Sequence, residues 1–322
     1  MKFWTIVIKL FLVVLFFFHI SCGPSIQFYG CIEGDCQDGI GTWLDGSGTI
    51  YKGKFENGKR KGSGTLTYPD GEKWEGHWND DRQWNGSGTI MSEWYKYVGR
   101  YKKGKRNGKG DFTLFDWPYN ANYIGSWKDG EMHGNGTFLF SSGAKYVGEW
   151  KNGDMHGSGT YIYNNGSSFN GKLNLDTLDG EGVYTAINGY QYSGDFKSNL
   201  FTGKGKEILA DESLYQGEFQ RNYRHGEGSI TMTDGDVYKG SWIRGKKQGL
   251  GDQKFDNGNR YVGEWNQGYI HGKGIMLKAN GKKYFGNWVE GAIQSHIPKE
   301  ELLTYLENKY LNFTDLKVGN EL

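Results

Sequence analysis

Four histidines are the first residues whose type and spacing suggest chemistry. They share the pattern His-Gly-x-Gly and are separated by 23 residues or by multiples of 23: His133, His156, His225 and His271. A recurring histidine invites zinc ligation, but equivalent residues of adjacent β-hairpins lie two strands apart, about 10 Å. Zinc holds each histidine nitrogen at about 2.0–2.1 Å, so two such histidines cannot share an ion. The sequence therefore predicts no metal site, and we assign these histidines to turns.

The N-terminal segment carries the second candidate. Two lysines precede an apolar run at residues 10–20, which is the layout of a secretory signal and is short for a membrane span. Ser21 directly precedes Cys22 in an arrangement that resembles a bacterial lipobox, although His19 stands where that motif has leucine. The resemblance implies a signal peptide at residues 1–21 and a lipid, such as palmitate, on Cys22. An uncleaved anchor and ordinary signal cleavage remain alternatives.

The other two cysteines, Cys31 and Cys36, form a candidate disulfide. The chain has three cysteines, an awkward number for an exported protein. If Cys22 carries lipid, the remaining pair can be oxidised outside the cytoplasm. The alternative is two free thiols in a chain whose anchor stays cytoplasmic, and the sequence leaves both open.

A basic stretch is the third candidate. It holds six cations within ten residues: Arg100, Lys102, Lys103, Lys105, Arg106 and Lys109. Such a run can meet anionic phospholipid headgroups or an acidic partner, and the plainer alternative is a solvated loop. The formal net charge of the whole chain is only +1, so no field draws it to nucleic acid. We predict no nucleic-acid partner.

The elements that position these residues follow from a strict internal repeat. The pattern aromatic-x-Gly-x-aromatic recurs at 23-residue intervals, apart from one interval of 26 that absorbs an insertion around Trp117. Strand period places the two aromatics and the glycine on one face, and a Gly-x-Gly later in each unit leaves bare backbone on which a neighbouring ring can lie. Each unit is therefore a predicted β-hairpin. The units start at Phe28, Tyr51, Trp74, Tyr97, Tyr123, Tyr146, Phe169, Tyr192, Tyr215, Tyr238, Tyr261 and Tyr284.

Turn residues stand at both ends of every hairpin. Seven residues after each start the sequence has only Gly, Asn or Asp, the residues that tolerate positive φ, from Asp35 in the first unit to Gly291 in the last. Asn-Gly or Asp-Gly pairs, such as Asn165-Gly166, join many of the units. These pairs predict two-residue hairpin connections.

The repeat closely resembles the MORN repeat, most clearly where Tyr123-x-Gly125-x-Trp127 leads to His133-Gly134-x-Gly136. The resemblance extends over nearly all of the mature chain, with departures at Ile32 and Leu173 in place of tryptophan and one extra residue in the unit that starts at Trp74. It implies an extended scaffold that brings proteins together or holds them at membranes. About thirty residues follow the last repeat, too few for an appended catalytic domain.

The predicted fold is all-β. It is an elongated single-layer antiparallel sheet of about twelve stacked MORN-type hairpins, with a short C-terminal capping α-helix. A signal peptide (1–21) and a short tether (22–27) precede the repeat array (28–296), and residues 297–322 form the helix and tail. Leucines at helical spacing after Pro298 predict the helix up to about Asn312, laid over the last hairpin to protect its edge.

These features predict a non-enzymatic, membrane-associated scaffold of the cell envelope, facing the periplasm or held at the outer membrane. Its partner is an unidentified protein or phospholipid headgroups. The sequence contains no nucleophile elbow, phosphate-binding loop or HExxH motif, and we predict neither catalytic residues nor a cofactor. The alternative function is a carbohydrate- or peptidoglycan-binding surface protein that uses exposed aromatic rows.

Overall fold

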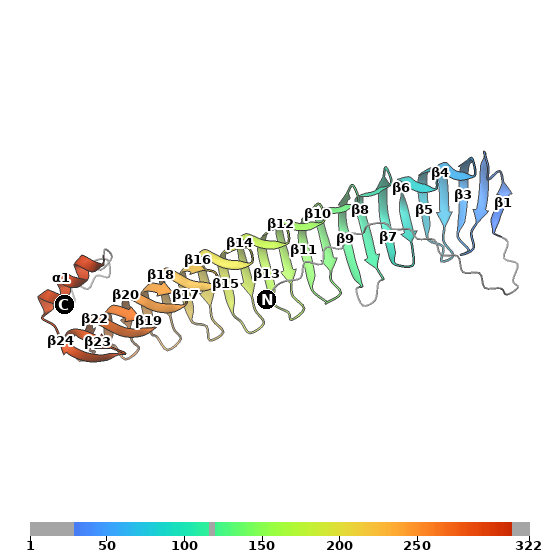
Figure 1. Cartoon of the computed structure of the whole chain (residues 1–322). Coiled ribbons are helices and arrows are strands. Elements are labelled where there is room, and N and C mark those ends of the chain that lie inside the picture. Colours follow the sequence, from blue (N-terminus) through green and yellow to red (C-terminus); the bar gives the residue numbers. More distant parts are fainter. Residues whose placement is uncertain (1–28, 116–119, 311–322) are drawn as a thin grey trace, which may run out of the picture.

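The computed structural model describes residues 29–115 and 120–310, which fold into one open antiparallel sheet of 24 strands followed by a short helix (Figure 1). The sheet is a long, gently twisting ribbon, and the helix lies at its C-terminal end. This architecture confirms the predicted fold class. The signal segment, Cys22, the tether, the first repeat start at Phe28 and the predicted helix end at Asn312 lie outside the described residues.

The first twelve strands are β1 (Gly30–Gly34), β2 (Ile40–Leu44), β3 (Ile50–Glu56), β4 (Lys59–Thr67), β5 (Lys73–Asn79), β6 (Arg82–Met91), β7 (Tyr95–Lys102), β8 (Lys105–Leu114), β9 (Ala121–Lys128), β10 (Glu131–Leu139), β11 (Lys145–Lys151) and β12 (Asp154–Ile162). The others are β13 (Ser168–Asn174), β14 (Thr177–Thr185), β15 (Gln191–Lys197), β16 (Leu200–Ile208), β17 (Leu214–Gln220), β18 (Tyr223–Thr231), β19 (Val237–Ile243), β20 (Lys246–Lys254), β21 (Arg260–Asn266), β22 (Tyr269–Leu277), β23 (Lys283–Val289) and β24 (Ala292–His296). The helix is α1 (Lys299–Lys309).

A continuous row of glycines crosses the sheet, and we call it the glycine file. Each strand pairs with the next strand in the chain, and glycine lies opposite glycine both within a unit (Gly148 and Gly159) and between units (Gly159 and Gly171). The file steps sideways once, on β6, where Gly86 pairs with β5 and Gly88 with β7. The extra residue in that unit causes the step, because it shifts the register of one strand.

The turns inside the units are the two-residue connections. On β11–β12, Asn152 and Gly153 both have positive φ, of 53° and 94°, as a type I′ turn requires. The residue seven after each start has positive φ in every unit except the first, as the sequence predicts. Asp35 is the exception: its carboxylate accepts the backbone N–H groups of Gln37 and Asp38, in a loop of different shape.

The connections between units differ from the prediction. Around Asn165-Gly166, Tyr163 pairs with Ser167 and the Gly166 N–H donates to the Tyr163 carbonyl, so the loop has three residues. Only Gly166 has positive φ, whereas the Asn165 side chain accepts the Ser167 N–H at 3.0 Å. The predicted two-residue connection is therefore wrong. This is a type I turn closed by a glycine bulge, and asparagine is used there for its side-chain acceptor.

The core is a zipper of aromatic rings along one face, which we call the aromatic face. Trp150 packs edge-on against Tyr146 of its own unit and Tyr123 of the preceding unit, with ring centroids 5.2 and 5.4 Å apart. Its indole N–H donates to the Gly136 carbonyl of the preceding unit at 3.3 Å. The same arrangement recurs along most of the array, and Leu173 replaces the tryptophan while remaining buried. No hairpin could bury these rings alone.

The two glycines of each Gly-x-Gly have different roles. A Cβ atom on Gly159 would lie 2.3 Å from the Tyr146 Oη, because the tyrosine of the same unit lies on this glycine. Gly157 instead has a φ of +61° at a bulge where the register between β11 and β12 shifts. The prediction that both glycines receive a neighbouring ring is therefore only half correct, because the bulge breaks the strict alternation of faces.

Candidate interaction surfaces

The helix α1 covers the face of the sheet opposite the aromatic rings, which we call the reverse face. Leu302 and Leu306 are fully buried against Leu250, Val262 and Ile275 of β20–β22. No residue of the terminal strand β24 belongs to this cluster. The helix is present where the sequence predicts it, but its buried leucines cover an apolar patch on the sheet face rather than the terminal edge.

A single carboxylate fixes the far end of α1. Glu264 on β21 accepts hydrogen bonds from the hydroxyls of Tyr305 and Tyr310, at 3.1 and 2.8 Å, and forms an ion pair with Lys309 at 2.5 Å. Burial opposes ionisation of Glu264, but Lys309, the Lys273 backbone N–H and the Tyr310 hydroxyl outweigh it and lower its pKa. We call the part of the reverse face that α1 covers the α1 seat. It combines a row of apolar side chains, the bare backbone of the glycine file and a charged border.

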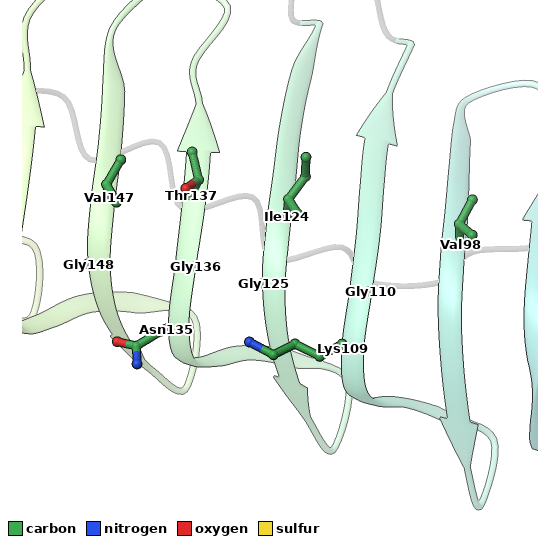
Figure 2. Close-up of a pocket in the computed structure, with 10 residues that line it drawn as sticks. All are labelled: Val98, Lys109, Gly110, Ile124, Gly125, Asn135, Gly136, Thr137, Val147 and Gly148. Atoms are coloured by element: carbon green, nitrogen blue, oxygen red, sulfur yellow. The ribbon is translucent and has the colours of Figure 1, made fainter.

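A related arrangement occurs without a cover on β7–β11, where Asp111 and Thr137 lie between the apolar residues of the row. A shallow groove of about 620 Å³ has the glycine file as its floor, with Val98, Ile124 and Val147 along one side and Lys109 and Asn135 along the other (Figure 2). We call it the β7–β11 trough. Val98, Ile124 and Val147 are 40%, 55% and 43% exposed, whereas Val262, the equivalent residue under α1, is 0% exposed. The sequence interpretation did not identify this surface.

A signal for the trough was nevertheless present in the sequence. The residue directly after the aromatic start is aliphatic or phenylalanine in only five units, at Val98, Ile124, Val147, Val262 and Phe285. The last two lie at the seat of α1. In most other units this position is polar, as at Gln216.

The basic stretch does not form one patch. Lys102, Lys103 and Lys105 are exposed at the β7–β8 turn. Arg106 instead turns to the aromatic face, where its guanidinium lies 4.2 Å from the centroid of Trp127 and burial lowers its pKa. Of the remaining two, which are exposed on the reverse face, Lys109 lines the trough, and Arg100 lies beside it against Gly108.

Other cations also stack on the aromatic zipper. Lys247 has its Nζ 4.7 and 4.8 Å from the ring centroids of Tyr238 and Trp265, and burial lowers its pKa to about 8. Arg60 and Arg224 lie in the same way over rings of their own and the next unit. Each of these cations lies on the second strand of its hairpin and covers the buried rings from that strand.

The recurring histidines lie on the second strand of their hairpins, so their predicted assignment to turns is wrong. His156 is opposite Glu149 and is half-buried, and the Nδ1 atoms of His133 and His156 are buried without a hydrogen-bond partner. Within residues 29–115 and 120–310, no group of three or more His, Cys, Asp or Glu side chains is placed to hold a metal ion. In the same two ranges no helix is long and apolar enough to cross a bilayer.

Cys31 and Cys36 lie in the first hairpin, on β1 and in the loop that follows it, and the structure joins their sulfur atoms in a disulfide. Cys36 is buried beside Tyr51 and Phe55 at the start of the aromatic zipper. The link therefore ties the irregular first loop to the regular array.

The aromatic residues that start the described repeats are buried, with relative exposures of 0–1% from Tyr51 to Tyr261, so they do not form a surface for stacking sugars. Their hydroxyls are also used internally: the Tyr146 Oη donates to the Glu149 carbonyl at 3.0 Å. The described aromatic residues that are exposed, including Trp94 and Tyr269, lie at scattered positions in loops and strand ends.

Comparison with known families and structures agrees with this geometry. The family model described as "MORN repeat" matches eight segments, which together make up more than half of the chain: residues 51–73, 97–117, 123–145, 146–168, 192–213, 215–237, 238–260 and 261–283. No curated protein sequence matches the chain significantly.

The solved structures give only remote likenesses. The TCP domain of SAS-4 (dCPAP) in complex with a proline-rich motif of Ana2 (dSTIL) of Drosophila melanogaster is 13% identical, and the alignment covers 56% of this chain and 84% of that one with a TM-score of 0.28. A streptogramin B lyase is 11% identical, with 83% and 88% covered and a TM-score of 0.18. At these TM-scores neither likeness carries a conclusion.

Proposed function

This chain belongs to the MORN repeat family, and from that premise we propose that it is a non-enzymatic scaffold of the cell envelope. In this proposal the repeat array holds a protein partner close to a membrane. The N-terminal segment supplies the membrane anchor, and the strands supply the binding surface.

The observation that carries the proposal is the single-layer architecture. The repeats use their aromatic rings to bury one another, and what remains is a long, shallow surface with polar residues spread along it. Catalysis usually needs polar groups that converge in a concave pocket. The β7–β11 trough is open and floored by glycine, which suits the binding of an extended partner better than a reaction.

Anchoring at Cys22 would place the array at the membrane. Residues 23–27 separate Cys22 from the first repeat, and five residues span at most about 18 Å. Lipid on Cys22 would therefore hold the first hairpin near the headgroups. The disulfide between Cys31 and Cys36 supports an oxidising compartment outside the cytoplasm. The exposed Lys102, Lys103 and Lys105 are candidates for contact with anionic headgroups.

The anchor is tested by labelling cells with palmitate. The wild-type chain should take up label and stay in the membrane fraction after alkaline extraction, because an acyl chain adds about 0.8 kcal/mol of membrane affinity per buried CH₂. Cys22→Ala should lose the label, whereas Ser25→Ala, a nearby control, should keep it. Label that persists in Cys22→Ala, or a wild-type chain that never takes up label, would exclude the lipoprotein assignment.

The scaffold role is tested by crosslinking in cells followed by mass spectrometry. We expect crosslinks from the reverse face of the array to one or a few polypeptides. If purified protein instead turns over a small molecule, or binds glycans while capturing no polypeptide, the scaffold proposal is wrong.

A further inference from the structure

The position of α1 on its own sheet indicates what the β7–β11 trough can bind. The α1 seat and the trough both lie on the reverse face, across the glycine file. Their residues occupy equivalent positions in the repeat. Val262 and Phe285 beneath α1 correspond to Val98, Ile124 and Val147 in the trough. The one site is filled by a helix that buries two leucines four residues apart, and the other is open.

The dimensions also match. The trough extends from β7 to β11, which is four strand spacings or about 19 Å. A helix rises 1.5 Å per residue, so about 13 residues would span it. Val98, Ile124 and Val147 lie on alternate strands, about 10 Å apart, which is close to the rise of seven helical residues. A helix along the trough could thus present apolar side chains to each of them in turn.

At its β7–β8 end the border of the trough differs in charge from the border beneath α1, whereas Glu149 on β11 keeps the carboxylate of Glu264. At the α1 seat the border residue is Glu264, which pairs with Lys309. The residue equivalent to Glu264 in the unit that starts at Tyr97 is Arg100, and the residue equivalent to Lys273 is Lys109. Within the described part of the chain, no carboxylate forms an ion pair with either cation. A helix whose charges complement this border therefore carries acidic residues at the position where α1 carries Lys309.

This charge pattern, together with chain length, excludes the chain's own segments as the natural occupant. An α1 helix from a second copy would have to leave its own sheet, where Leu302 and Leu306 are fully buried, and would bring Lys309 toward Arg100. Residues 1–21 contain no Asp or Glu. Residues 311–322 follow α1 at β21, about 48 Å from β11 by strand spacing, and twelve residues reach at most about 43 Å.

We propose that the β7–β11 trough is the docking site for an amphipathic α-helix of a separate protein, with apolar residues at i, i+7 and i+14 and an acidic border facing Arg100 and Lys109. This inference rests on the proposed scaffold function and names the kind of partner that the scaffold holds.

The test uses two fluorescent synthetic helices of about 18 residues that share one leucine stripe, one bordered by glutamates and one by lysines. They are titrated by anisotropy against the full chain in amphipol. The glutamate-bordered helix should bind more tightly. Ile124→Lys should weaken it at least tenfold, and Gln216→Lys, the same substitution at the equivalent exposed position of a polar unit, should change it less than twofold. Arg100→Glu combined with Lys109→Glu should reverse the preference between the two helices.

Several results would overturn the inference. One is that neither helix binds at the highest soluble concentration. Another is that Ile124→Lys and Gln216→Lys lose affinity for the glutamate-bordered helix equally. A third is that the peptide photo-crosslinks to β20–β23. Self-association of the chain, or binding to anionic vesicles, that is abolished by Ile124→Lys would assign the trough to a second copy or to lipid instead. Circular dichroism confirms that each variant folds. A cellular partner whose crosslinks survive Ile124→Lys would leave the scaffold proposal standing while this inference fails.

Discussion

At the scale of single residues, the array depends on where a side chain is absent. Gly159 accommodates the Tyr146 ring, whose hydroxyl then reaches the Glu149 and His156 carbonyls. A tyrosine is used here because it combines a large apolar ring with a polar end that can be satisfied inside the sheet. The glycine and the ring are therefore one structural unit.

The first prediction concerns this contact. Gly159→Ala should lower the free energy of unfolding by about 3 kcal/mol, the upper part of the range for overpacking, because the new methyl group would overlap the Tyr146 ring. Ser158→Ala, on the exposed neighbouring residue, should change it by less than about 0.5 kcal/mol. Guanidinium denaturation followed by tryptophan fluorescence measures both. Equal losses in the two variants would show that the ring does not need the glycine.

The second prediction concerns the buried ammonium of Lys247. Its pKa is lowered to about 8 by burial, whereas an unfolded lysine titrates near 10.4. Between these values the unfolded chain binds more protons, so the stability contributed by this site rises as the pH rises. Relative to Lys247→Met, the wild-type chain should gain about 2 kcal/mol between pH 7 and pH 9.5.

Denaturation midpoints of both proteins at the two pH values measure this gain. Tyrosine ionisation is common to the two proteins and cancels in the comparison. A stability difference that does not change with pH would mean that Lys247 keeps an ordinary pKa in the fold.

At the scale of elements, no hairpin or helix is stable alone. Five of the described tryptophans donate their indole N–H across a repeat boundary, as Trp150 does to Gly136, whereas that of Trp265 has no partner. Each apolar face needs the next unit to cover it. The helix α1 also depends on its neighbours for stability. Its first turn has acidic residues, but Pro298 at its N-cap makes no side-chain hydrogen bond to cap it. Packing on the sheet, rather than helix propensity, therefore holds α1 in place.

The third prediction follows from that packing. Leu306→Ala should loosen α1, because truncation of a fully buried leucine costs about 2–5 kcal/mol and leaves only Leu302 and the Glu264 contacts to hold the helix. Hydrogen exchange in residues 299–309 should become fast while β7–β11 keep their protection. Glu307→Ala, which changes an exposed residue of the same helix, is the control. Protection of α1 that persists in Leu306→Ala would contradict the assigned seat.

At the scale of the whole molecule, stability is distributed along the ribbon. Each strand makes most of its contacts with its two neighbours, and contacts such as that of Trp150 with Tyr123 reach one strand further. The helix α1 returns over β20–β23. Such an array has no central core and behaves as a one-dimensional series of units coupled to their neighbours. Its length, rather than a pocket, is what it can offer to partners.

The fourth prediction concerns this length. Twenty-four strands at about 4.8 Å give a sheet about 110 Å long, with a radius of gyration of about 30 Å. A compact globular chain of the same length would have a radius of gyration of about 20 Å. Small-angle X-ray scattering of the monomer distinguishes the two. A value near 20 Å would mean that the ribbon folds back on itself in solution.

The sequence by itself determined the repeat, the strands, the aromatic face and the turns inside the units. These features depend on local rules: side chains alternate with a period of two, and positive φ at positions such as Gly153 restricts the residue type. The start pattern of each unit was therefore sufficient to predict the sheet. The same rules predicted a helix after Pro298.

Only the tertiary structure decided how the units meet and what their reverse face presents. The register shift beside Gly157 leaves this glycine and Ser158 without partners on β11, so counting by twos could not show that Gly157 lies against Glu149 rather than under a ring. The physical reason is that contacts between repeats depend on register, and register is set by neighbouring strands rather than by local sequence.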